Sequence, residues 1–195
     1  MIEFGPSLIP VLYRVRQKWK TDFLENPEET VIREMSLYKE RIRPGSRIGI
    51  AAGSRGIYHY SRIIKAVVDF VKESKAEPFI IPAMGSHGGA TAEGQLEVLE
   101  GYGITPESMG VPFLSSMETN TIGYTKEGVP VHFDKNACSM DGIIMVNRIK
   151  PHTDFHGEIE SGIMKQMAIG LGKQRGASTI HRRGIYGLSV LMPES

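Results

Sequence analysis

Residues Arg47–Gly56, RIGIAAGSRG, join a short apolar run to a glycine-flanked loop. A short apolar run bounded by turn-forming residues is typical of a buried strand. The run PFIIP at Pro78–Pro82 has the same character, and Tyr60–Lys75 between the two has the spacing of an amphipathic helix. A strand, a helix and a second strand form the unit from which parallel sheets are built, so this stretch decides the fold class.

The same alternation of helix and strand continues on both sides of this unit. Glu28–Arg41 has helical spacing, and Ala92–Tyr102 is predicted to form a helix after the loop AMGSHGGAT. Pro112–Phe133 favours extended structure with a turn at Glu127-Gly128, and Asp141–Ile149 is the strongest strand prediction in the chain. We therefore predict a single α/β domain over residues 1–195, with an open, mostly parallel sheet flanked by helices and a β-hairpin insertion.

Charge and cysteine content narrow the function classes only a little. The chain of 195 residues carries 23 Lys and Arg against 22 Asp and Glu, a formal net charge of +1. This balance gives no electrostatic reason to expect nucleic acid or an anionic membrane as a partner. The single Cys138 cannot form an internal disulfide, and the sequence shows neither a run of about 18 apolar residues nor a secretory leader pattern. We expect a cytoplasmic protein.

Polar side chains follow three of the predicted strands. Ser54 and Arg55 come after the first, His87 after the second and His152 after the strongest. Because open α/β sheets bind ligands at the carboxyl ends of their strands, we expect Arg55, His87 and His152 to share one site. Backbone N–H groups at Ser54 and the Arg55 guanidinium could together bind a phosphate or a carboxylate.

Several of these residues also have a structural interpretation. The segment GSRG is a common turn, and lysines are usually solvated, which would place Lys165 and Lys173 at the surface. We interpret His59 and His132 as structural. Of the two histidines at positions 152 and 156, we prefer His152, because the proline before it fixes its approach.

Three aspartates are candidate metal ligands. Asp134, Asp141 and Asp154 carry suitable oxygens, but neither a His-x-x-x-His helix nor a cysteine pair accompanies them. The sequence alone therefore gives no strong prediction of a metal held by these side chains.

Five segments together carry a family resemblance. GSRG, PAMGSHGGAT, SME, VNRIKPHTDFHGEIESGIMKQMAIGLGK and GASTIH resemble the amino-terminal catalytic domain of the nickel-pincer lactate racemase family, in particular its branch of uncharacterised racemase-like proteins. The resemblance extends from about Gly49 to His181. It implies a nickel-pincer nucleotide, a pyridinium mononucleotide tethered to a lysine through a thioamide, whose nickel is held by a ring carbon, two sulfurs and one histidine.

The resemblance also implies a role for each matching residue. The implied roles are acid and base for His87 and His152, substrate binding for Arg55, cofactor binding for Lys165, Ser54 and Arg55, with Lys165 as the tether, and nickel binding for His181. Two features depart from the family. Ala52 stands where the racemase carries an aspartate three residues before the arginine, and the segment ahead of the tethering lysine reads GEIESGIMK in place of a more compact turn.

The implied activity is that of an isomerase, a racemase or epimerase of small 2-hydroxy acids. The hydroxyl proton of the substrate would pass to one histidine and the C2 hydride to the cofactor, leaving a planar keto acid that can be reduced on either face. Histidines suit this task because their ordinary pKa near 6.5 lets each act as an acid or a base.

The resemblance further implies a second, carboxy-terminal lobe that follows the catalytic domain. We therefore expect the chain to be an amino-terminal part that is inactive alone, with the lobe and the cofactor-synthesis enzymes as partners. Two other function classes remain open: a non-catalytic phosphate- or nucleotide-binding α/β module, and a metal-dependent lyase acting on a hydroxy acid. Neither class requires Lys165 or His181.

Overall fold

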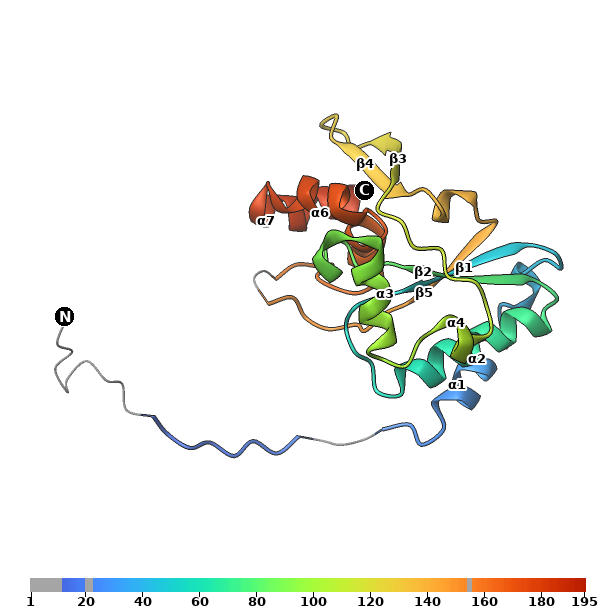
Figure 1. Ribbon diagram of the computed structural model, residues 1–195. Coiled ribbons are helices and arrows are strands. Elements are labelled where there is room, and N and C mark those ends of the chain that lie inside the picture. Colours follow the sequence, from blue (N-terminus) through green and yellow to red (C-terminus); the bar gives the residue numbers. More distant parts are fainter. Residues whose placement is uncertain (1–11, 20–22, 154–155) are drawn as a thin grey trace, which may run out of the picture.

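A three-stranded parallel sheet forms the centre of the chain (Figure 1). The computed structural model describes residues 12–19, 23–153 and 156–195. The strands β1 (Arg47–Ala52), β2 (Glu77–Pro82) and β5 (Gly142–Val146) lie in the order β2-β1-β5. In the central strand Ile50 lies opposite Ile80 of β2 and Ile144 of β5. The sheet and its helices confirm the predicted α/β class.

Helices and short helical turns precede, connect and follow the strands. Within the described ranges none of these helices is both long enough and apolar enough to cross a membrane. In chain order they are α1 (Pro27–Ser36), η2 (Lys39–Arg41), α2 (Tyr60–Glu73), η3 (Gly88–Ala90), α3 (Ala92–Glu100), α4 (Pro106–Met109), η4 (Ala137–Ser139), α5 (Ile163–Lys165), η5 (Gln166–Gly170), α6 (Lys173–His181), α7 (Gly184–Tyr186), η6 (Gly187–Leu191) and α8 (Met192–Glu194).

Side chains of the sheet alternate between two apolar layers. Ile50 and Ile80 pack into the cluster that contains the apolar stripe of α2. Ala51 and Ile81 face the other way and share a cluster with Leu171, which is fully buried. In Figure 1, α1, α2 and α4 lie on one side of the sheet, and α6 and the hairpin lie on the other. Burial on both faces is the usual condition of a parallel sheet, because its connecting helices cover it.

The predicted hairpin is present as β3 (Thr119–Tyr124) and β4 (Pro130–Asp134), which pair antiparallel. Its turn is closed by a hydrogen bond from the Thr125 amide to the Val129 carbonyl, 2.9 Å long. The turn requires a positive φ at Gly128, which is 74°, and glycine adopts this conformation without the steric cost of a side chain.

The first predicted helix is shorter than expected. We predicted Glu28–Arg41, whereas α1 ends at Ser36 and a separate 3-10 turn covers Lys39–Arg41. Leu37 and Tyr38 lie between them and are 74% and 56% exposed, so no apolar contact continues the helix across this point.

The sequence did not predict the helices that follow residue 162. From Ile163 to Glu194 the chain forms short α-helices joined by π-helical turns. Glycines in this part allow carbonyl oxygens to approach closely: a Cβ on Gly172 would lie 2.2 Å from the Ala168 oxygen, and one on Gly187 would lie 2.0 Å from the Ile180 oxygen. Glycines at contact positions and the residue inserted by each π turn obscure the regular 3.6-residue spacing.

The contact between η3 and α3 gives a test of the fold. A Cβ on Gly94 would lie 2.1 Å from the Gly88 carbonyl oxygen, so we expect Gly94→Ala to lower the free energy of unfolding by about 1–3 kcal/mol. Urea denaturation measures the change. Gly101→Ala is the matched control, because its nearest heavy atoms would be 3.5 Å away, and it should change stability by less than about 0.5 kcal/mol. Wild-type stability of Gly94→Ala would contradict this close packing.

Candidate functional site

Two tyrosines hold the loop after β1. The Tyr60 hydroxyl donates to the Gly53 carbonyl over 3.1 Å, and the Tyr102 hydroxyl donates to the Ser54 carbonyl over 2.8 Å. Burial raises the pKa of Tyr60, which keeps this hydroxyl protonated as a donor. The Arg55 side chain is exposed next to this fixed backbone.

The loop after β2 brings His87 to the first loop. The Ser54 hydroxyl oxygen lies 2.5 Å from Nδ1 of His87, a short hydrogen bond between two of the predicted site segments. Gly85 starts the bend with a φ of 62° and donates its amide to the Gly170 carbonyl over 3.0 Å. A Cβ at Gly85 would lie 3.1 Å from the Ile169 carbonyl oxygen, so glycine permits both the bend and this contact.

The segment after β5 places His152 next to Lys165. His152 is only 8% exposed, and its Nε2 lies 2.8 Å from Nζ of Lys165. Its backbone amide donates to Oε2 of Glu160 over 2.7 Å, while Oε1 of Glu160 lies 3.2 Å from Nδ1 of His156. Glu160 therefore contacts both His152 and His156. Asp154 lies outside the described residues.

Gln166 fixes Lys165 at the edge of the sheet. This glutamine is 4% exposed, and its Nε2 donates to the carbonyl oxygens of Ala51 and Val146, each over 3.1 Å. Those oxygens belong to the carboxyl ends of β1 and β5. The amide bridges two neighbouring strands, so the residue before it is held where both strands end.

Electrostatic effects link the remaining site residues to this cluster. Desolvation lowers the pKa of His87, and the positive charges of Arg55 and Lys165 lower it further. Partial desolvation and the charge of Lys165 likewise lower the pKa of His181. Both imidazoles are thus favoured in the neutral form, which can accept a proton or bind a metal. Among the six predicted site residues, hydrogen-bond contacts join Ser54 to His87 and His152 to Lys165. Electrostatic interactions link Arg55 and Lys165 to His87, and Lys165 to His181.

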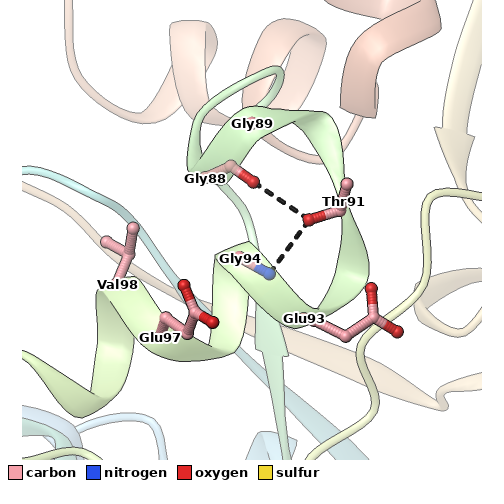
Figure 2. Close-up of a pocket in the computed structure, with 7 residues that line it drawn as sticks. All are labelled: Gly88, Gly89, Thr91, Glu93, Gly94, Glu97 and Val98. Atoms are coloured by element: carbon pink, nitrogen blue, oxygen red, sulfur yellow. Dashed lines mark hydrogen bonds between the residues drawn. The ribbon is translucent and has the colours of Figure 1, made fainter.

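A groove lies on the α3 side of the His87 loop (Figure 2). It is lined by Gly88, Gly89, Thr91, Glu93, Gly94, Glu97 and Val98, and the Thr91 hydroxyl caps the helix by accepting from the Gly94 amide over 3.0 Å. The groove contains none of the six predicted site residues. Its two glutamates would repel a carboxylate substrate, so we do not place the site there.

Two of the three candidate metal-binding aspartates have structural partners instead. Asp134 forms an ion pair with Lys173, and Oδ2 of Asp141 accepts the Arg47 amide over 2.8 Å. Across residues 12–19, 23–153 and 156–195, no three His, Cys, Asp or Glu side chains form a group that could hold a metal.

The surface location expected for Lys173 is wrong. Its side chain is fully buried, with Nζ 2.9 Å from Oδ2 of Asp134 and 2.5 Å from the Pro82 carbonyl oxygen. Burial lowers the pKa of Lys173, and the neighbouring Asp134 opposes that change. A lysine can be buried when its charge is paired, and the partner here lies on the hairpin, which the sequence pattern did not connect to it.

Comparison with known proteins supports a family assignment. The family model described as lactate racemase N-terminal domain matches residues 26–187. The chain belongs to this family. The match confirms the predicted resemblance and covers all three strands of the sheet and all six site residues. Among curated proteins, no similar sequence is found.

The lactate racemase family is associated with a nickel cofactor. The side chains of this site can be compared with what such a cofactor needs from the protein. Lys165 presents a primary amine beside His152, as a covalent tether requires. His181 supplies an imidazole whose neutral form is favoured. One protein ligand fits a metal whose other ligands come from an organic cofactor, so the residues present fit such a group.

The charge on Arg55 gives a test of this electrostatic description. Arg55→Gln removes a cation that disfavours protonation of His87, so the pKa of His87 should rise. Titration of the imidazole by NMR measures the change, with Arg33→Gln on α1 as the control that leaves it unaltered. An unchanged or lower pKa of His87 in Arg55→Gln would show that the two side chains do not interact.

The depressed pKa of His87 also predicts the pH dependence of stability. Its stabilising contribution should be complete above the unfolded pKa near 6.5 and should be lost as pH falls through the lower folded value. Comparing the unfolding free energies of wild type and His87→Gln across that range isolates the contribution. A difference between the two proteins that does not vary with pH would contradict the depressed value.

Proposed function

We propose that this chain is the catalytic domain of a nickel-pincer-nucleotide-dependent racemase or epimerase of small 2-hydroxy acids. The observation that carries the proposal is the position of Lys165, which lies 2.8 Å from His152 and whose charge acts on both His87 and His181. An amine in contact with one histidine and in electrostatic interaction with two others matches a site for a tethered cofactor between acid/base groups.

Lys165 and His181 are the residues that would hold the cofactor. The Lys165 amine would form the thioamide link, and the His181 imidazole would bind the nickel. Ser54 and Arg55 would add polar contacts from the loop after β1. When bound, the cofactor supplies the acceptor for the hydride that leaves C2 of the substrate.

The chain itself would supply proton transfer. His87 and His152 come from loops after different strands, so they can approach a bound hydroxy acid from different directions. One imidazole would remove the hydroxyl proton, and the other would serve when the acid of opposite configuration reacts. Neutral imidazole is the form needed for removal, and desolvation together with the Arg55 cation, which would remain after Lys165 is tethered, favours that form at His87.

Arg55 would bind the substrate carboxylate. Its side chain is exposed beside His87, and a guanidinium can hold a carboxylate through two parallel hydrogen bonds. This contact would orient the hydroxyl group toward the histidines. Substrate turnover would also require exclusion of water from the reacting carbon, and we assign this role to a carboxy-terminal lobe of the enzyme.

The proposal includes the cell compartment and the partners of the protein. Cys138 is exposed and free, as is common for a protein in a reducing compartment, and we place the enzyme in the cytoplasm. Cofactor-synthesis enzymes would load Lys165 there.

Kinetics of the full-length, cofactor-loaded protein test the proposed function. Replacing His87 or His152 by Ala should slow interconversion of the two enantiomers about 100-fold to 10,000-fold, because a general acid/base is lost, while the nickel content stays unchanged. Polarimetry and metal analysis measure the two quantities.

His132→Ala is the matched control, because this histidine lies on β4 outside the proposed site, and it should retain wild-type kinetics. Full activity in both His87→Ala and His152→Ala would rule out the proposed acid/base pair. Loss of nickel from either variant would instead make that histidine a metal ligand.

A further inference from the structure

Lys173 combines three unfavourable features at one residue. Its side chain is fully buried, it begins helix α6, where the helix dipole repels a cation, and its φ of 54° lies in the left-handed region. A non-glycine residue with all three features persists only where its surroundings hold it firmly, and such residues cluster near functional sites.

Three oxygens surround the Lys173 ammonium group. Nζ lies 2.5 Å from the Pro82 carbonyl oxygen, 2.9 Å from Oδ2 of Asp134 and 3.3 Å from Oε1 of Gln95. The ammonium group donates hydrogen bonds to Pro82 and Gln95 and forms an ion pair with Asp134. Pro82 is the last residue of β2 and immediately precedes the loop that carries His87.

Gln95 extends these contacts to the His87 loop. It is fully buried in α3, and its Nε2 donates to the Gly85 carbonyl over 2.8 Å and to the His87 carbonyl over 3.3 Å. A glutamine amide can present either its oxygen or its nitrogen to a given neighbour. Because Lys173 can only donate, it selects the orientation in which the amide nitrogen faces the two carbonyls.

Asp134 joins the hairpin to the same network. Both side chains of its ion pair with Lys173 are fully buried, and Oδ1 of Asp134 accepts the Ala137 amide over 2.9 Å. The chain of contacts therefore runs from β4, through α6 and α3, to the backbone on both sides of Ser86.

We propose that Lys173 is a positioning residue: by orienting Gln95, it holds the backbone at Gly85 and His87 and so keeps the His87 imidazole against Ser54. Lys173 does not contact the substrate in this arrangement. Only the expected effect on turnover rests on the proposed racemase function. The expected effect on the His87 loop requires neither cofactor nor substrate.

NMR of the 195-residue chain tests the proposal without any cofactor. The ring nitrogens of His87 should show one preferred tautomer in the wild type, because Nδ1 is bonded to Ser54. In Gln95→Met the ring should show a mixture of tautomers, and the amides of Gly85 and His87 should exchange with solvent at least about ten-fold faster. Gln174→Met is the matched control, because Gln174 is exposed, and it should match the wild type.

The double variant Lys173→Met with Asp134→Asn tests the role of the lysine. It removes the buried charges together, so neither remains unpaired, and it keeps an oxygen that can accept the Ala137 amide. We expect the same change at His87 as in Gln95→Met, although Gln95 is present. Circular dichroism shows whether each variant is folded.

Three results would overturn the proposal. The first is that folded Gln95→Met keeps the wild-type tautomer of the His87 ring and the wild-type exchange rates of the Gly85 and His87 amides. The second is the same result in the folded double variant. The third is loss of the fold in both variants, because the network would then support the whole domain rather than this loop.

In the full-length, cofactor-loaded protein, Gln95→Met should lower kcat about 10-fold to 100-fold with little change in KM, because a misplaced acid/base group slows the chemical step. If His87 changes in the NMR experiment while turnover does not, the positioning role stands and the acid/base role of His87 fails.

Discussion

The close contact between the β2 loop and the segment that follows Lys165 is the constraint on which the site depends. Gly85 donates its amide to Gly170, and a Cβ on Gly170 would lie 2.6 Å from the Ala83 carbonyl oxygen. Two stretches of backbone can approach this closely only where side chains are missing. One stretch carries His87 and the other carries Lys165, so this contact sets the separation between the proposed acid/base group and the proposed tether.

The electrostatic character of the site follows from this arrangement. Arg55 and Lys165 bring two cations close to His87, and Lys165 also acts on His181. Cations at this edge of the sheet disfavour protonated imidazoles and attract carboxylates and phosphates. Once Lys165 forms the proposed thioamide it carries no charge, so in the loaded enzyme Arg55 would be the cation that holds an anionic hydroxy acid and helps to keep His87 neutral.

Short-range patterns predicted most of the sheet and much of the site. Arg47–Ala52 forms a strand with the predicted bounds, and the strands after which Arg55, His87 and His152 were expected do end at one edge. The strand prediction succeeded because apolar runs bounded by glycine and proline reflect local chain geometry. The prediction of a shared edge succeeded because parallel strands end together. The family resemblance added Lys165 and His181, whose chemistry no local pattern indicates.

The contacts that support the site could not be predicted from such patterns. Lys173 and Gln95 are polar residues that local rules place at the surface. They are buried because they contact each other across 78 residues of sequence, and because Lys173 also contacts Pro82 and Asp134. The helices after residue 162 were missed for a related reason, since glycines that serve tertiary contacts interrupt their apolar spacing.

The most direct test of the account is the mass of the peptide that contains Lys165, taken from protein produced together with the cofactor-synthesis enzymes. A thioamide bond survives denaturation and a nickel–imidazole bond does not, so the denatured protein should release its metal and keep an added organic mass on Lys165. Lys150→Ala should carry the same adduct, and Lys165→Ala should carry none. A racemising protein whose Lys165 peptide has its unmodified mass would contradict the central claim.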